Sequence, residues 1–300
     1  MNLQPWMRPE HLAPGDTKSL QGDWSGLELH TIRSTADPFF ETAFGALWKE
    51  FGEAGEMERA GVIAERMKWH PSQTHDGAAL LYAMQLITRN GEFVAVRDHT
   101  AILLANEPGA IVHLSHNLVA PAWRRSGIAG WLRALPVSTA REALAAAGRP
   151  IDAPITLVGE MEHFNPETEA TGIRLTAYEK AGYKMVDPSL VDYRQPDFRD
   201  PRIIDQENGP QPIPLCLMLR RIGKEHEEFV SGAEVRQCVN GLYKMYGRGF
   251  RKQDMQAVLQ TLKNYPPPHA RIPLVPPTRA VRNPKLAGDL SPLSLESPLT

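Results

Sequence analysis

The sequence is short of cysteine, of long apolar runs and of net charge, and each shortage excludes a class of protein. Only two cysteines, Cys216 and Cys238, occur in 300 residues, so reduced thiols are expected rather than a disulfide framework. No run reaches about 18 apolar residues, and no membrane span is predicted. The net charge of −2 lacks the basic excess of a nucleic-acid surface. The N-terminal residues have no continuous apolar core, so no secretory signal is predicted and a cytoplasmic protein is expected.

What is present is typical of a soluble globular chain. Hydrophobic residues make up 42% and charged residues 23% of the sequence, which are ordinary proportions. The length allows one large domain with extensions. The spacings of His70, His75, Asp76 and His99 match no structural zinc pattern. No metal is therefore expected.

The apolar periodicity predicts an α/β (α+β) fold in the order β-α-α-β-β-β-α-β-α-β-β, with a mixed sheet and helices on its faces. Asn90-Gly91 is a two-residue hairpin signal between two of these strands. Expected strands cover residues 27–33, 80–88, 92–104, 111–119, 155–161, 183–195 and 213–222. Expected helices begin at 38 and cover 57–69, 128–135, 141–147, 172–181, 233–246 and 252–264.

Composition divides the chain into four parts. Residues 1–26 are rich in proline, glycine and polar residues and are predicted to be an irregular extension. Residues 27–223 carry the α/β pattern, and residues 224–265 carry two amphipathic helices. Residues 266–300 contain nine prolines. This tail is predicted to be disordered, without regular helix or sheet.

The stretch from Ile111 to Leu135 organises the chain. It predicts a buried strand over 111–119, in which Val112, Leu114, His116 and Leu118 alternate with the intervening polar residues. A basic turn with two glycines follows, and then a helix with an apolar face. A turn of this kind directs several backbone N–H groups at one point, so it indicates a site for a phosphate or pyrophosphate.

Two motifs resemble signatures of the GNAT acetyltransferase superfamily. Arg124-x-x-Gly127-x-Ala129, after a strand ending in Val-x-Pro, resembles its acyl-CoA motif. Tyr178, four residues before Gly182, resembles its Tyr-x-x-x-Gly-Phe/Tyr helix. The resemblance covers about residues 27–222 and implies a splayed central sheet into which acyl-CoA inserts.

The resemblance also implies a donor site. Backbone groups at Asn117, Leu118 and Val119 would pair with the pantetheine arm of acetyl-CoA. The turn residues Arg124, Arg125, Ser126, Gly127, Ile128, Ala129 and Gly130 would hold the pyrophosphate, helped by the helix dipole. The alternative interpretation is a solvated basic turn before an ordinary core helix.

Acyl transfer requires a base for the amine and an acid for the departing thiolate. Tyr178 matches the family position of the acid, although a buried aromatic on an amphipathic helix is the plainer interpretation. The base is left open. His113 resembles a proton-transfer histidine of the family, while Glu160, Glu162, His163 and a water chain compete with it.

These observations lead us to predict an N-acetyltransferase with acetyl-CoA as donor and a primary amine as acceptor, acting by direct attack in a ternary complex. A non-catalytic acyl-CoA-binding regulatory module and an interaction protein using the C-terminal extension are the alternatives. Neither the acceptor nor the oligomeric state follows from the sequence. Pro136 is expected to kink or end its helix, and Cys216 is expected to be buried and inert.

Overall fold

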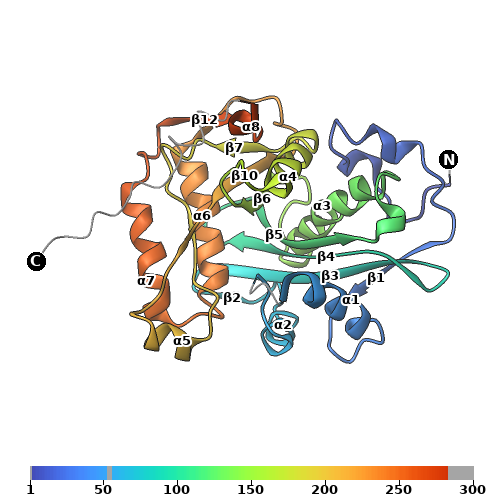
Figure 1. The fold of residues 1–300 in the computed structure, drawn as a ribbon, viewed down its shortest axis with the longest axis horizontal. Coiled ribbons are helices and arrows are strands. Elements are labelled where there is room, and N and C mark those ends of the chain that lie inside the picture. Colours follow the sequence, from blue (N-terminus) through green and yellow to red (C-terminus); the bar gives the residue numbers. More distant parts are fainter. Residues whose placement is uncertain (1, 53–55, 283–300) are drawn as a thin grey trace, which may run out of the picture.

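A computed structural model describes residues 2–52 and 56–282. Ten strands form one sheet in the order β1-β3-β4-β5-β6-β10-β7-β12-β11, with β2 paired to β3 (Figure 1). The strands are β1 (Leu27–Ile32), β2 (Thr74–His75), β3 (Ala78–Arg89), β4 (Glu92–Leu104), β5 (Ala110–Val119), β6 (Ile155–Met161), β7 (Lys184–Val186), β10 (Cys216–Arg221), β11 (Phe229–Ser231) and β12 (Arg271–Val275). A separate ribbon pairs β8 (Arg194–Gln195) with β9 (Ile213–Pro214).

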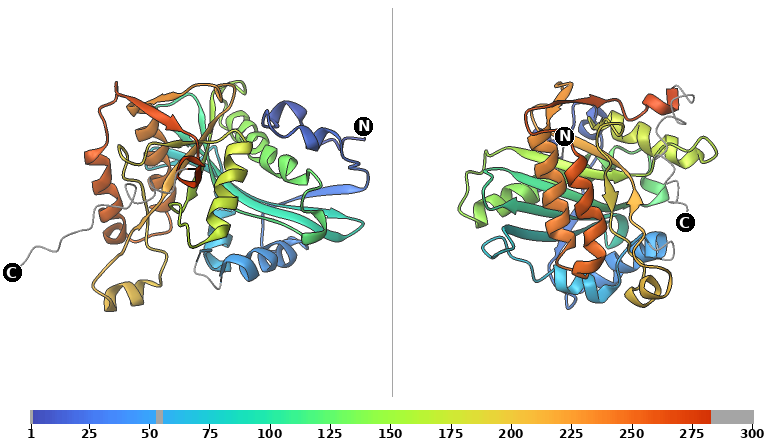
Figure 2. Two further views of the ribbon diagram at one scale, coloured as in Figure 1. Left: turned by 45° about the horizontal axis from the view of Figure 1, so that its top comes forward. Right: turned by 90° about the vertical axis from the view of Figure 1, so that its left-hand side faces the viewer.

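The helices cover both faces of this sheet. They are α1 (Phe40–Leu47), α2 (Ala60–Arg66), α3 (Ile128–Ala146), α4 (Glu169–Lys180), α5 (Pro201–Gln206), α6 (Gly232–Tyr246), α7 (Lys252–Thr261) and α8 (Arg279–Arg282). Helices lie on both sides of the sheet (Figure 2). Apolar side chains of α3 and α4 pack on one face, and those of α1, α2, α6 and α7 pack on the other. None of the helices in the described part of the chain is long and apolar enough to cross a membrane. The predicted α/β class with a mixed, helix-flanked sheet is confirmed.

The sheet opens between β5 and β6, the parallel pair at its centre. These strands pair from Ala110 opposite Ile155 to Leu114 opposite Gly159. Beyond that point β6 continues along β10, whereas the second half of β5 continues along β4. The predicted splay is therefore present, and it leaves one edge of residues 115–119 turned toward the gap.

A β-bulge shapes β5 just at this opening. The register with β4 runs from His99 opposite Leu114 to Arg97 opposite Asn117, so two residues of β5 lie opposite Asp98. Such a bulge reverses the alternation of side chains along the strand. The uniform alternation predicted for 111–119 is therefore wrong: Leu114 packs with α3, whereas Leu118 packs with α1 on the opposite face.

Helix α3 continues through Pro136, and the expected break does not occur. Proline lacks the N–H that would bond to the carbonyl four residues earlier, which is that of Leu132. The buried guanidinium of Arg97 replaces this donor, because its Nη1 bonds to Leu132 O at 2.8 Å. A side chain from β4 thus compensates the helix for its proline.

The N-terminal extension packs on the start of α3. Among residues 2–26 the only regular elements are two short 3-10 turns, Pro9–His11 and Thr17–Leu20. Ser19 O accepts hydrogen bonds from the indole N–H groups of Trp24 at 2.8 Å and Trp131 at 3.1 Å. Trp24 is 1% exposed, so this irregular segment contributes to the core.

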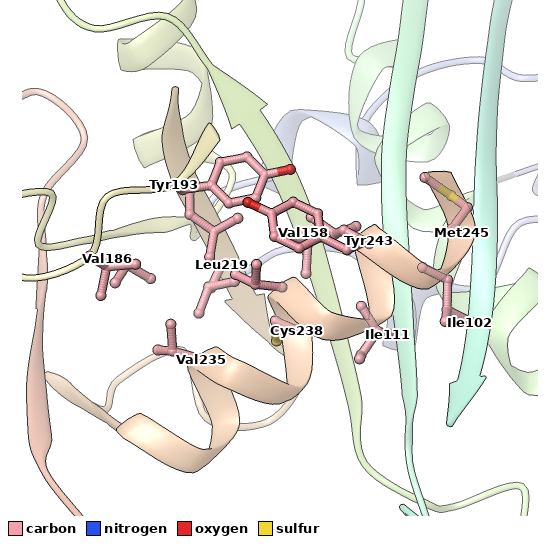
Figure 3. Close-up of a cluster of buried hydrophobic side chains, with 14 of the residues drawn as sticks. Ile102, Ile111, Val158, Val186, Tyr193, Leu219, Val235, Cys238, Tyr243 and Met245 are labelled. Carbon is pink, nitrogen blue, oxygen red and sulfur yellow. The ribbon is translucent and has the colours of Figure 1, made fainter. Parts of the chain in front are cut away.

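The C-terminal part continues the same sheet. Helix α6 lies on β5, β6 and β10 through a core that includes Ile111, Val158 and Leu219 (Figure 3). The prediction that the Pro-rich tail lacks regular structure is wrong for residues 271–275, which form β12, and for residues 279–282, which form α8. Pro273 is tolerated in β12 because it contributes its carbonyl, which accepts from Asp187 N at 3.2 Å. Residues 283–300 lie outside the described part.

Candidate active site

A cavity of about 700 Å³ lies where β5 and β6 separate. Its lining comes from both faces of the sheet, so the cavity passes through the opening. We name its two ends after the helices that flank them. The α3 side is lined by Arg97, Asn117, Val119, Arg124, Arg133, Ala177, Tyr178, Ala181 and Tyr183, and the α6 side by Glu50, Phe51, Glu58, Arg66, His113, His116, Glu160, Gln195, Phe198 and Tyr246.

A buried carboxylate, Glu160, is the centre of the α6 side. Its side chain is 6% exposed and accepts four hydrogen bonds. Oε2 accepts from His113 Nε2 at 2.6 Å, from the Tyr246 hydroxyl at 2.6 Å and from Gln195 Nε2 at 3.3 Å, while Oε1 accepts from the Tyr193 hydroxyl. The arrangement brings together two residues predicted from the sequence, His113 and Glu160.

These contacts keep Glu160 ionised and direct one N–H group of His113 at it. Burial alone raises the pKa of Glu160, but the interaction with His113 and the phenol hydrogen bonds outweigh it, and the net pKa is lowered. An ionised Glu160 only accepts hydrogen bonds, so Nε2 of His113 carries the proton directed at it. In the neutral imidazole Nδ1 is then a free acceptor.

Ser115 connects this acceptor to the cavity. Its Oγ lies 3.3 Å from His113 Nδ1, and Ser115 itself lines the cavity. The hydroxyl donates to Nδ1 and keeps its lone pairs for a further donor. Ser115, His113 and Glu160 therefore form a hydrogen-bonded chain from the cavity to a buried anion.

Tyr178 lies on the other side of the opening, above Gly159. A Cβ placed on Gly159 would be 3.0 Å from Tyr178 Cε1 and 3.1 Å from its hydroxyl. Because Gly159 has no side chain, the phenol can lie directly against β6. Gly159 is also the last residue of β6 that pairs with β5. Burial raises the pKa of Tyr178, so its hydroxyl stays protonated at neutral pH.

His116 is a second ionisable group in the lining, and the sequence pattern gave it no role. Its Nδ1 is 3.0 Å from Asp98 Oδ1, and its Nε2 is 2.9 Å from Glu56 O. Burial alone lowers the pKa of His116, but Asp98 outweighs it and raises this pKa to about 9. The same pairing holds the pKa of Asp98 well below its usual range. His116 is thus a cation that joins β5 to the segment before α2.

The predicted donor residues are only partly brought to the cavity. Asn117, Leu118, Val119 and Arg124 line it, whereas residues 125–130 are not among its lining residues. Within the turn, Ile128 N donates to Ser126 Oγ at 3.1 Å, and Gly130 N donates to Gly127 O at 3.1 Å. Ser126 N also donates, to Trp123 O at 3.2 Å. Three of the amides predicted for the pyrophosphate, those of Ser126, Ile128 and Gly130, thus have internal acceptors.

The two glycines of the turn have a packing role. Gly127 has φ of 101°, and a Cβ there would be 3.0 Å from Lys18 O. A Cβ on Gly130 would collide with Ser19 Oγ, whose hydroxyl donates to Gly127 O at 2.6 Å. The N-terminal extension therefore accounts for glycine at these positions, independently of any phosphate.

The competing base candidates lie apart from the Glu160 cluster. Glu162 pairs with Arg174 at 2.9 Å, and both side chains are about half exposed. His163 Nδ1 lies 3.4 Å from Cys216 Sγ. Burial raises the pKa of Cys216 to about 12, so its thiol is unreactive, as expected. In the described ranges no group of three or more His, Cys, Asp or Glu side chains is placed to hold a metal ion.

No protein-family model matches the sequence, and no curated protein matches it. Several solved structures, among them these three, are similar to it. A tandem GNAT protein from the clavulanic acid biosynthesis pathway is 18% identical with a TM-score of 0.34, over 63% of this chain and 52% of its own. The Escherichia coli ribosomal-protein-S18-alanine N-acetyltransferase is 13% identical with a TM-score of 0.33, over 65% of this chain and 94% of its own. An aminoglycoside 6'-N-acetyltransferase complexed with coenzyme A is 16% identical with a TM-score of 0.34, over 65% of this chain and 97% of its own.

This chain thus spans about half the length of the tandem protein. All identities are below 20% and all TM-scores below 0.4. The function is therefore argued from the side chains of the cavity.

Sequence reasoning missed Tyr193, Gln195, His116 and Tyr246. Tyr246 is the last residue of α6, 86 positions after Glu160. It belongs to the apolar stripe of an amphipathic helix, where a tyrosine is usually a core residue. No local spacing connects it with β6, so only the fold brings the two together.

Proposed function

We propose that this protein transfers an acetyl group from acetyl-CoA to a primary amine by direct attack in a ternary complex. The observation that carries the proposal is the cavity through the split sheet, with Tyr178 on one side of the opening and the Ser115–His113–Glu160 chain on the other. A donor and an acceptor that enter from opposite faces would meet at the opening. Such a geometry suits direct transfer without a covalent enzyme intermediate.

The α3 side suits the donor. The edge of residues 115–119 that faces the gap offers backbone groups to the amides of a pantetheine arm. Arg124, at the mouth, suits the phosphates. Arg97 and Arg133 also line this side, but Arg97 bonds to Leu132 O and Arg133 pairs with Asp16. Arg124 is therefore the cation that we assign to the anionic donor.

The α6 side suits the acceptor. An alkylammonium titrates near pH ~10, so it must lose a proton before it attacks. We assign this proton to Nδ1 of His113, received directly or through the Ser115 hydroxyl. Glu160 then faces the imidazolium, and its negative charge stabilises the product of the transfer.

The chemical step follows from these positions. The neutral amine attacks the thioester carbonyl, a C–N bond forms, and the tetrahedral intermediate collapses with cleavage of the C–S bond. The departing thiolate takes the phenol proton of Tyr178. The nitrogen of the intermediate gives up its second proton, which returns to the phenolate, and His113 releases the first proton to water. The products are therefore an amide, free CoA and one proton.

The test is release of CoA thiol from acetyl-CoA, followed with a panel of polyamines, amino acids, aminoglycosides and basic peptides. The wild type is expected to release thiol with at least one class, and Glu160→Gln is expected to release it far more slowly. Glu162→Gln changes a cavity carboxylate that lies outside the cluster and serves as the matched control. If the protein binds CoA and is stabilised by it, but none of the amines in the panel causes thiol release, it is a binding module and the proposal is refuted.

A further inference from the structure

We infer that Tyr246 of α6 is a positioning residue for the Glu160–His113 pair, which makes the C-terminal extension an integral part of the active centre. The inference rests on the proposed function, since it assigns a role within that reaction. It goes beyond the GNAT resemblance, which ends near residue 222 and so contains neither α6 nor Tyr246.

The contacts of the Tyr246 hydroxyl carry the inference. It donates to Glu160 Oε2 at 2.6 Å, and its oxygen lies 3.2 Å from His113 Nε2. It therefore touches the same carboxylate oxygen and the same imidazole nitrogen that bond to each other. Tyr246 is 1% exposed, so bulk water does not substitute for it.

The surrounding packing holds the phenol in this place. Helix α6 approaches β5 closely at Gly241, where a Cβ would be 3.0 Å from Ile111 Cδ1. The ring of Tyr246 meets those of Phe198 and Phe250 edge-on, each with centroids 5.8 Å apart. The N-terminus of α6 is fixed by a capping box between Ser231 and Glu234. A rigid helix thus delivers one hydroxyl to one carboxylate.

Tyr243, one turn earlier on the same helix, provides a comparison. Its ring stacks on Tyr193 with centroids 5.9 Å apart (Figure 3). Its hydroxyl donates to Arg194 O at 2.9 Å, and no hydrogen bond joins it to Glu160 within the described residues. The two tyrosines share a helix and a core, but only one of them reaches the carboxylate.

Several ionisable groups face Glu160: His113 from β5, Tyr193 from the segment before β8, Tyr178 from α4, and Tyr243 and Tyr246 from α6. The Tyr246 hydrogen bond stabilises the carboxylate anion and is one of the causes that lower its pKa. Its removal therefore raises the pKa of Glu160. Because the base requires an ionised Glu160, the acid limb of the kcat profile should move to higher pH.

The first experiment compares Tyr246→Phe with Tyr243→Phe in the full chain. Tyr246→Phe keeps the ring and is expected to lower kcat about tenfold, as for a hydrogen bond to a charged group. Its acid limb should move to higher pH, while KM for acetyl-CoA stays unchanged. Tyr243→Phe should leave the position of that limb unchanged. If both variants lower kcat without moving the limb, the role of Tyr246 is structural and the inference is wrong.

A second measurement needs no substrate. In protein labelled with ¹³C at the glutamate carboxyl carbons, the Glu160 signal, assigned with Glu160→Gln, should titrate at higher pH in Tyr246→Phe than in the wild type. Difluorotyrosine at 246, a stronger donor, should shift the titration to lower pH and leave the packing intact. Unchanged titrations in both variants would overturn the inference. A shifted titration in a protein that acetylates no amine would support the contact and refute only the proposed function.

Discussion

The α3 side of the cavity is built from Arg97 and two short stretches, residues 117–133 and 177–183. The α6 side takes its lining from the segment after α1, from α2, β5, β6, β8 and α6, and from Phe198. The first carries Arg124, which faces a long, anionic donor in our proposal. The second buries one carboxylate among a histidine, two tyrosines and a glutamine. The difference implies that donor binding and proton transfer can be damaged separately.

Glu160→Gln should have the largest effect, and it should fall on turnover alone. The amide keeps the shape but does not stabilise an imidazolium. We expect kcat to fall about 10³-fold, within the range for loss of positioned acid–base catalysis, with the dissociation constant of CoA unchanged. Steady-state kinetics and calorimetry measure the two quantities. Weakened CoA binding in this variant would show that the two sides are not separable.

His116→Gln tests how the α6 side is held together. The pKa of His116 is raised to about 9 in the folded protein, so its contribution is fully present below the unfolded pKa of about 6.5 and is lost as pH rises through 9. The variant should lose about 3 kcal/mol of unfolding free energy at pH 6. The loss should nearly vanish at pH 10.

Urea unfolding at the two pH values gives this difference. His269→Gln, at an exposed position, is the control. An equal loss at pH 6 and pH 10 would mean that the charge of His116 does not stabilise the fold.

Tyr178→Phe tests the opposite side of the opening. Loss of the acid should lower kcat about 100-fold and leave CoA affinity intact. Gly159→Ala should have a smaller effect in the same direction, because its Cβ pushes the phenol off β6. Tyr183→Phe, whose ring packs edge-on to Tyr178 at 5.0 Å, serves as the control. Full turnover in Tyr178→Phe would remove Tyr178 from the mechanism.

Arg124→Ala should have the smallest effect, and it should fall on the donor alone. Loss of one charge-assisted contact should weaken CoA binding about tenfold, with little change in kcat. Arg125→Ala removes the neighbouring charge, which is not in the cavity lining. Calorimetry measures the CoA affinity of both variants. An equal loss of affinity in Arg124→Ala and Arg125→Ala would mean that only the net charge of the turn affects CoA binding. Gly127→Glu is less informative, because it would also disturb the packing against Lys18.

Much of the α3 side was predictable because its signals are local. The strand, turn and helix of residues 111–135 follow one another, and hydrophobic periodicity places them without knowledge of the fold. Tyr178 and Gly182 also belong to one helix and its end. The splay followed from the resemblance, and it is present in the β5–β6 register, which ends at Leu114 and Gly159.

The rest depended on tertiary contacts. Pro136 was expected to kink or end its helix, because nothing in the sequence connects it with Arg97, whose guanidinium bonds to the carbonyl that proline leaves without a donor. The bulge at Asp98 reversed the strand alternation, and a one-residue change of register has no sequence signature here. Tyr246 of α6 and Glu160 of β6 meet only because α6 packs on the sheet at β5 and β6. Residues that act together but lie far apart in the chain escaped local reasoning.

The most direct test of the account is a crystal structure of the protein with CoA. We predict that the pantetheine arm lies along residues 115–119 of β5 and that its sulfur lies at the opening, within about 3.5 Å of the Tyr178 hydroxyl. The Ser115–His113–Glu160 chain should face the sulfur from the α6 side. CoA bound elsewhere on the surface, with no part of it between β5 and β6, would contradict the account.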